Sequence, residues 1–187
     1  MDSENEIVGA ARAFAIAAHG DQKYGRGEGA RPYVAHLDEV AAVLRQLGAP
    51  VSDIELAAAY LHDVVEDTPT TPAAIESALS RFGADVAAQL VGIATFCTDV
   101  PGPNRKQRKA ATYERMRRDV AAAPVWIRAA VRVKLADRIA NLRASHRDSL
   151  SLLDMYRRES AAFRAALFVA GICDAMWAEH DRLSAMD

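Results

Sequence analysis

Apolar residues recur at three- and four-residue spacing through almost the whole chain, and this period constrains the fold more than any other feature. A first segment, from about Glu4 to Ala18, places Ile7, Ala11 and Phe14 on one face. Stretches of alternating Val, Ile and Thr, which are typical of half-buried strands, are almost absent, and alanine is abundant. We therefore predict an all-α protein.

Capping residues and prolines mark where several helices begin and end. The segment Ser52-Asp53-Ile54-Glu55 has the pattern of a capping box and predicts a helix that continues through His62 and ends before Pro69. The pair Thr71-Pro72 opens the next helix, because threonine caps a helix and proline fits its first turn. Further helices are expected at about 36–48 and 84–94, from Pro124 through Asn141, and at 149–183 as one long helix or two, with a glycine-rich loop at 25–29.

Length and charge narrow the class of protein. At 187 residues the chain is long enough for one well-buried core, so we expect a single domain over 1–187, with core motifs in 18–142 and C-terminal helices in 149–183. The net charge of -2 argues against a general affinity for nucleic acid or an anionic membrane, and no run approaches the roughly 20 apolar residues of a bilayer span. The acidic N-terminus is unlike a secretory signal, which favours the cytoplasm.

The segment from Leu61 to Thr68 places one imidazole and three carboxylates within six consecutive positions. His62 and Glu66 are four residues apart, as are Asp63 and Asp67, so on a helix each pair would share a face. Buried carboxylates and imidazoles are costly unless they are paired or bind a cation. A divalent metal offsets that cost, and these ligand types suit Mn, Fe, Zn or Mg.

Two residues from other predicted helices complete a candidate metal site. His36 could cap a helix start, and Asp137 could pair with Lys134 or Arg138, so each has an ordinary explanation when taken singly. The interior of a helical bundle can nevertheless bring such groups around one ion. The ordered set His…His-Asp…Asp favours a metal site made of His36, His62, Asp63 and Asp137.

Four segments together resemble the HD-domain metal-dependent phosphohydrolases, and more specifically the hydrolase domains of the RelA/SpoT type and the small alarmone hydrolases. The matching segments are Ala18 to Gln22, Arg31 to His36, Leu61 to Thr68, and Val133 to Leu142. The His-Asp-x-x-Glu-Asp block combined with Lys-Leu-Ala-Asp-Arg is highly specific, whereas a His-Asp pair alone would identify only the superfamily.

The resemblance implies a helical HD fold and a reaction. That reaction is removal of the 3′-pyrophosphate from a guanosine tetra- or pentaphosphate alarmone of the stringent response, usually with Mn²⁺. It implies that the four candidate ligands hold the metal and that Glu66 and Asp67 orient or deprotonate the attacking water. No synthetase segment follows this region, so we expect the protein only to degrade its nucleotide.

Substrate contacts are expected from residues around these motifs. By resemblance, Asn141 contacts the nucleotide and Tyr156 forms a wall of the nucleoside pocket, although an aromatic residue at helical spacing is commonly core. Lys134 could hold the metal ligand or reach a phosphate. The basic run after Asn104 is either a solvated helix face or a set of phosphate contacts made by Arg105, Lys106 and Arg108.

One departure from the family concerns the base. The family usually carries Arg two residues after Gln22, against the guanine, whereas this chain has Tyr24 with Lys23 and Arg26 on either side. A guanidinium stacks and also donates to guanine O6 and N7, whereas a phenol stacks and offers a single hydroxyl. We therefore expect Tyr24 to stack on the purine and the adenosine counterpart, (p)ppApp, to be accepted as well as or better than (p)ppGpp.

Two other functions fit the same motifs. A general HD nucleotidase or pyrophosphohydrolase would keep the four ligands but would have no particular need for Glu66 and Asp67. A nucleotide-binding module with a decayed active site is the second alternative, and the intact ligands and carboxylates count against it.

Overall fold

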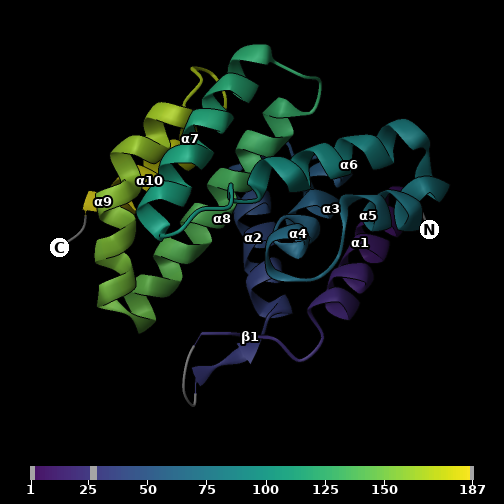
Figure 1. The fold of residues 1–187 in the computed structure, drawn as a ribbon, viewed down its shortest axis with the longest axis horizontal. Helices are drawn as coiled ribbons and strands as arrows, with labels where there is room; N and C mark the ends of the chain where they lie inside the picture. Colours follow the sequence, from purple (N-terminus) through teal and green to yellow (C-terminus); the bar gives the residue numbers. More distant parts are fainter. Residues whose placement is uncertain (1–2, 26–28, 186–187) are drawn as a thin grey trace.

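The computed structural model describes residues 3–25 and 29–185, and over these ranges the chain is almost entirely helical (Figure 1). The predicted all-α class is confirmed. The helices are α1 (Ser3–His19), α2 (Val34–Leu47), α3 (Asp53–Leu61), α4 (Val64–Asp67), α5 (Pro72–Leu79), the 3-10 helix η2 (Ser80–Phe82), α6 (Ala84–Cys97), α7 (Arg105–Ala122), α8 (Ile127–Asp148), α9 (Leu150–Leu167) and α10 (Asp174–Ala185).

The local sequence explains several helix ends. The Ser52 side chain accepts a hydrogen bond from the backbone N–H of Glu55, and the Glu55 carboxylate accepts one from the N–H of Ser52, so the predicted capping box opens α3. Thr71 caps α5 and Pro72 occupies its first turn, also as predicted. Gly20 follows α1 with φ of +52°, a conformation that suits glycine after a helix end.

Other boundaries differ from the sequence prediction. Helix α8 begins at Ile127 rather than at Pro124, because Ala123 ends α7 in the left-handed conformation and the Pro124 carbonyl closes a turn onto the Ile127 N–H. The sequence left one long helix or two open for the tail, and the structure has two, because the chain leaves α9 before Gly171 and Cys173, which both have positive φ. The positive φ of Ala123 and of Cys173 could not be predicted from the sequence, because residues other than glycine rarely adopt it.

A short hairpin, which the sequence did not predict, follows α1. Its strands are β1 (Lys23–Tyr24) and β2 (Arg31–Pro32), which pair antiparallel with Lys23 opposite Pro32 and Tyr24 opposite Arg31. The hairpin lies beside the helices at the lower edge of Figure 1. It brings Tyr24 against α8, where the Tyr24 hydroxyl donates to Asn141 Oδ1 at 2.9 Å.

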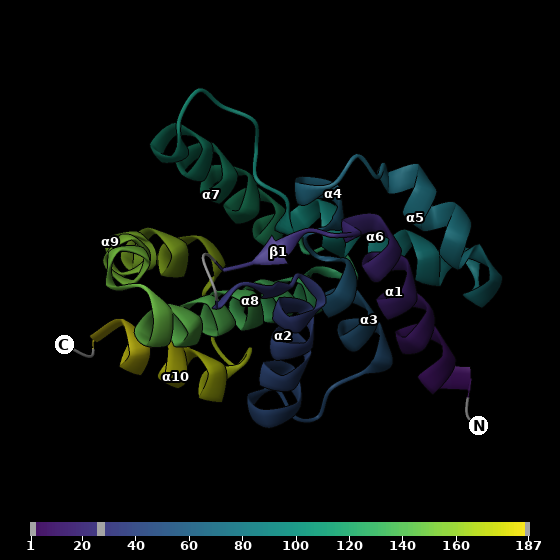
Figure 2. The ribbon, with the colours of Figure 1, turned by 90° about the horizontal axis from the view of Figure 1, so that it is seen from below.

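Helix α8 crosses the middle of the molecule and packs against α2, α3, α6, α9 and α10 (Figure 2). Its apolar side chains belong to the core, but Lys134, Asp137 and Arg138 are buried with them. Buried charges are costly unless they are paired, so the polar row on α8 points to a site inside the bundle. In the part of the chain that the structure describes, no helix combines the length and the apolar character needed to cross a bilayer.

Candidate metal centre and active site

The turn between α3 and α4 presents the first two candidate ligands. Helix α3 ends at Leu61, so the prediction of one continuous helix through His62 and towards Pro69 is wrong. The chain turns at His62 and Asp63 and then makes the short helix α4. The turn aims both side chains at α2 and α8.

All four predicted ligands meet at one point. One donor atom from each of His36, His62, Asp63 and Asp137 lies within 4.8 Å of every other. His36 Nε2 lies 3.5 Å from Asp63 Oδ2 and 3.3 Å from Asp137 Oδ1. His62 Nε2 lies 3.0 Å from Asp63 Oδ2 and 3.6 Å from Asp137 Oδ1. Ligand atoms about 2.1 Å from a common ion are separated by roughly these distances, so the cluster has the size of a metal site.

The hydrogen bonding of His62 supports the same reading. Its Nδ1 lies 2.8 Å from the Ala59 carbonyl, which can only accept, so Nδ1 carries the proton. The buried Nε2 has no hydrogen-bond partner and faces two carboxylates. A lone pair pointing at carboxylate oxygens is repulsive unless a cation lies between them. The donor set therefore fits a divalent ion.

The electrostatics of the cluster also call for positive charge. Burial lowers the pKa of His62, but Asp63 and Asp137 outweigh that effect and raise the pKa to about 10. The pKa of Asp137 is held well below its usual range, because Lys134 and the two imidazoles outweigh the burial of its carboxyl group. Two ionised carboxylates at this point can be balanced by a proton on an imidazole or, more completely, by a metal ion.

Helix α8 fixes the orientation of Asp137 through its own next residues. Lys134 Nζ donates to Asp137 Oδ2 at 3.0 Å, and Asn141 Nδ2 donates to Asp137 Oδ1. Asn141 in turn accepts the hydrogen bond from Tyr24. The Tyr24 ring stacks on His36, with ring centroids 4.5 Å apart. Tyr24 thus contacts one candidate ligand, His36, and through Asn141 supports another, Asp137, a role that the sequence did not predict.

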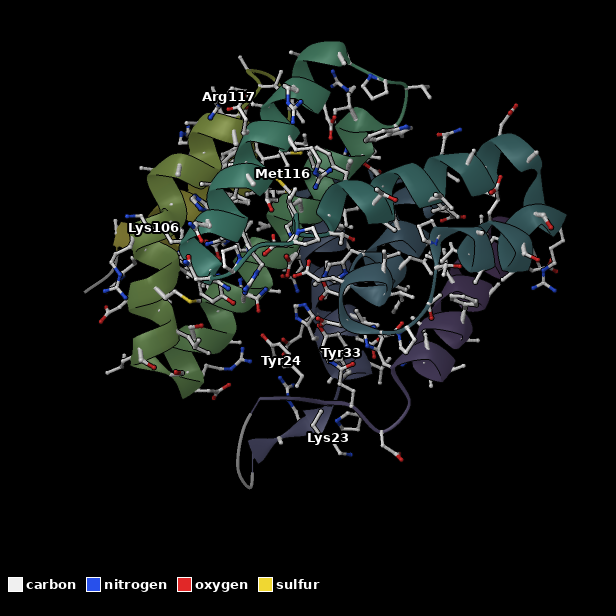
Figure 3. The ribbon with its side chains drawn as sticks, in the orientation of Figure 1. Lys23, Tyr24, Tyr33, Lys106, Met116 and Arg117 are labelled. Atoms are coloured by element: carbon white, nitrogen blue, oxygen red, sulfur yellow. The ribbon has the colours of Figure 1, made fainter. Side chains whose placement is uncertain are left out.

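The Tyr33 hydroxyl lies between the candidate ligand Asp63 and Asp67, which with Glu66 forms the predicted carboxylate pair. Its hydroxyl lies 2.7 Å from Asp63 Oδ2 and 2.6 Å from Asp67 Oδ2. Its ring stacks on the buried His19, with centroids 4.2 Å apart, so the phenol has little freedom to move. In Figure 3 Tyr24 and Tyr33 point from the hairpin side towards the polar centre of the molecule. Tyr33 is a site residue that the sequence analysis missed.

Removing the Tyr33 hydroxyl is expected to weaken metal binding. Second-layer partners orient metal ligands, and their loss costs roughly 10- to 100-fold in affinity. Tyr33→Phe should therefore lower Mn²⁺ affinity by about that factor in isothermal titration calorimetry. Tyr60→Phe is the matched control, because the Tyr60 hydroxyl donates to Asp38 away from the cluster. Equal affinities for the two variants would contradict this role of Tyr33.

Cationic side chains form part of the wall of a cavity at the cluster. The cavity has a volume of about 240 Å³ and reaches from the metal cluster to α7 and α9. It is lined by Glu66 and Asp67 beside four cations, which are Arg105, Lys109, Lys134 and Arg138. Arg105 donates through Nε and Nη2 to Glu159, and Arg138 Nη2 donates to the same carboxylate. Tyr156 lies under both guanidinium groups, 5.9 and 4.8 Å from its ring centroid.

A second cavity continues from the first. It has a volume of about 470 Å³ and shares Tyr24, Asn141 and Tyr156 with the metal-side cavity. The C-terminal end of α8 and the first turn of α9 supply most of its remaining lining, including Ser145 and Leu152. The two cavities together have room for a phosphorylated group near the cluster and a nucleoside beyond it.

Most of the predicted substrate contacts lie in these cavities, and three lie elsewhere. Tyr24, Arg105, Lys134, Asn141 and Tyr156 line the metal-side cavity. Lys23, Lys106 and Arg108 do not line either cavity, and Figure 3 shows Lys23 and Lys106 at the outer edge of the molecule. Arg26 lies outside the described residues.

Two cavity residues on the cationic wall were missed. Lys109 lies one helical turn after Arg105 and so shares its face of α7, whereas Lys106 does not. Arg138 could not be chosen from its position, because its burial between the rings of Tyr156 and Phe163 is set by tertiary packing.

The chain matches proteins of one family over most of its length. A family model described as an HD domain matches residues 11–164. The chain is 40% identical over 135 residues to the guanosine-3′,5′-bis(diphosphate) 3′-pyrophosphohydrolase MESH1 of Danio rerio, covering 72% of this chain and 66% of that protein. It is 34% identical over 138 residues to the guanosine-3′,5′-bis(diphosphate) 3′-pyrophosphohydrolase of Aquifex aeolicus, covering 74% of this chain and 18% of that protein. It therefore spans less than two thirds of the length of these relatives.

A solved structure has the same fold. It is that of a metazoan ortholog of SpoT that hydrolyses ppGpp and plays a role in starvation responses, and it superposes with a TM-score of 0.75 at 23% identity. The superposition covers 98% of this chain and 94% of the other. The match of the family model over most of the chain shows that the protein belongs to the HD domain family.

Proposed function

We propose that this protein hydrolyses the 3′-pyrophosphate of alarmone nucleotides, (p)ppGpp or (p)ppApp, and releases pyrophosphate. The observation that carries the proposal is one cavity lined by three members of the four-residue cluster, His36, Asp63 and Asp137, together with the carboxylates of Glu66 and Asp67 and four cationic side chains. The names of the relatives from Danio rerio and Aquifex aeolicus support the same reaction.

The cluster would hold one divalent ion, which we propose to be Mn²⁺, through His36, His62, Asp63 and Asp137. Such an ion supplies the positive charge that makes water acidic near neutral pH and polarises a phosphate oxygen. Glu66 and Asp67 orient the attacking water and accept its proton. Both are anchored, because the backbone N–H of Asp99 donates to Glu66 Oε2 and the Tyr33 hydroxyl lies against Asp67.

The cationic wall suits a substrate with several phosphate groups. The protein carries a net charge of -2, so a polyanion needs local positive charge in order to enter. Arg105, Lys109 and Arg138 line the same cavity as the cluster, where they can bind the 5′-phosphates while the 3′-pyrophosphate lies at the cluster. Lys134 pairs with the cluster residue Asp137, so it serves the reacting end.

The nucleoside would occupy the second cavity, and Tyr24 would influence the choice of base. One face of the Tyr24 ring is used by His36, and the residue borders both cavities, so we propose that the purine stacks on its other face. Tyr24→Arg should shift the ratio of guanine to adenine alarmone turnover towards guanine, because a guanidinium can donate to O6 and N7. Turnover of ppGpp and ppApp measured side by side checks this, and an unchanged ratio would refute the role of Tyr24.

Product analysis tests the proposed function. Purified protein with Mn²⁺ is incubated separately with ppGpp and ppApp, and His62→Ala is the blank. Release of pyrophosphate from either nucleotide, absent in the blank, is the expected result. If neither nucleotide is cleaved while the metal is shown to be bound, the proposal is overturned in favour of another phosphorylated nucleotide or a binding role.

We further propose that the protein acts in the cytoplasm on a small nucleotide, without a nucleic-acid or membrane partner. Its net charge of -2 supports this, since binding to a polyanionic backbone depends on an excess of positive charge.

A further inference from the structure

The loop between α6 and α7 supplies the hydrogen bond that holds Glu66. The backbone N–H of Asp99 donates to Glu66 Oε2 at 2.9 Å. Asp99 does not line the metal-side cavity, and its side chain, 7% exposed, pairs with Lys109 at 2.8 Å. The orientation of Glu66 therefore depends on how firmly this loop is held.

One face of α7 holds three successive residues of that loop. Arg115 Nη2 donates to the Thr98 carbonyl, and Lys109 Nζ donates to the Asp99 carboxylate, each at 2.8 Å. The hydroxyl of the fully buried Thr112 accepts from the N–H of Val100, also at 2.8 Å. The three α7 residues are spaced three apart, so they lie on one side of the helix. Hydrogen bonds between α7 and three consecutive loop residues fix the direction of the Asp99 N–H.

Burying the Asp99–Lys109 ion pair costs desolvation free energy that an apolar anchor of the loop would not cost. Burial lowers the pKa of Lys109, and a buried ion pair stabilises a fold no better than apolar residues of similar size. Lys109 also borders the cavity, so the same side chain that holds Asp99 faces the place of a substrate phosphate. A purely structural loop anchor would not need a cation at that point.

We propose that Asp99 and Lys109 are positioning residues for the reaction, which act by fixing the loop amide that orients Glu66. The inference rests on the proposed function, because it assigns Glu66 the attacking water. Lys109 additionally couples the two ends of the cavity, since a phosphate drawn to its ammonium group stiffens the loop that holds Glu66.

Steady-state kinetics with Mn²⁺ and the better of ppGpp and ppApp test the inference. Asp99→Asn keeps the size of the side chain but removes the charge that pairs with Lys109. We expect kcat to fall by roughly 10- to 100-fold, as for a small misplacement of a reacting group, while KM and Mn²⁺ affinity stay within about twofold. Asp85→Asn, at an exposed position in the first turn of α6, is the matched control.

A double-mutant cycle separates positioning from general damage. If Asp99 acts through Glu66, then adding Asp99→Asn to Glu66→Gln should cause no further loss, measured with enzyme in excess over substrate. Additive losses, or a raised KM at unchanged kcat, would overturn the inference. Lys109→Met, whose apolar stem can keep its packing, is the second variant if Asp99→Asn does not fold. Because Lys109 also borders the cavity, the KM of this variant is expected to rise, and only the loss in kcat at saturating nucleotide enters the same cycle.

The failure of this inference can be distinguished from the failure of the proposed function. A wild-type protein that releases no pyrophosphate from either nucleotide overturns both. An active wild type with an equally active Asp99→Asn overturns the positioning role alone.

Discussion

Alanine in place of His62 is expected to abolish metal binding and hydrolysis together. His62 supplies the buried Nε2 that lacks a hydrogen-bond partner and faces both carboxylate ligands. A metal ion in such a reaction contributes several kcal/mol to the transition state, so its loss should lower kcat/KM by about a thousandfold or more. Mn²⁺ content after gel filtration and pyrophosphate release from the same sample measure the two effects.

His146→Ala is the matched control for this change. Its Nε2 lies 2.9 Å from the Leu183 carbonyl, between α8 and α10, and it belongs to no group of candidate ligands among the described residues. The control should keep its metal and its activity. A His62→Ala protein that still binds Mn²⁺ stoichiometrically would show that the cluster is not the metal site.

Removal of the carboxylate pair is expected to separate binding of the metal from chemistry. Glu66→Gln and Asp67→Asn leave all four ligands in place, so Mn²⁺ should stay bound. Hydrolysis should fall by roughly 10²- to 10⁴-fold, the usual contribution of a positioned acid or base. Partial burial raises the pKa of Glu66, so the wild-type rate should decline as the pH falls through that raised value, because the base becomes protonated. The decline should disappear in Glu66→Gln.

A variant that combines Glu66→Gln with Asp67→Asn also distinguishes the rival functions. Alarmone hydrolysis that survives the loss of both carboxylates would favour a general HD nucleotidase, which has no particular need for them. If the wild type binds the nucleotide without hydrolysing it, and the variant binds it with the same affinity, a binding module would be favoured. Metal analysis and nucleotide titration on each protein decide between these outcomes.

Helix ends were predictable wherever capping residues or a proline mark them locally in the sequence. The Ser52 capping box and the Thr71-Pro72 pair act within one turn of chain, so their effect can be read without knowledge of the fold. The turn at His62 could not be seen in this way. The polar residues around it have helical spacing, and the helix is interrupted because His62 and Asp63 must face α2 and α8, which is a tertiary requirement.

The cluster of four candidate metal ligands was predictable as a set, but the partners of the cavity residues were not. His36, His62, Asp63 and Asp137 were selected by residue type and order, and they do meet. Contacts such as that of Arg105 with Glu159, 54 residues away, depend on how α7 packs against α9. Among the basic residues, the helical period would have separated Arg105 and Lys109 from Lys106, but the boundaries of α7 were needed to apply it.

Because three separate segments meet at the cluster, the stability of the fold should depend on the concentration of free metal. The unfolded chain cannot hold His36, the His62-Asp63 turn and Asp137 around one ion, so an ion that binds there binds almost solely to the folded state. Such linkage adds about 2.7 kcal/mol of stability when free metal exceeds Kd a hundredfold. Scarcity of the ion would then shorten the lifetime of the protein as well as slow it, and abundance and activity would rise and fall together.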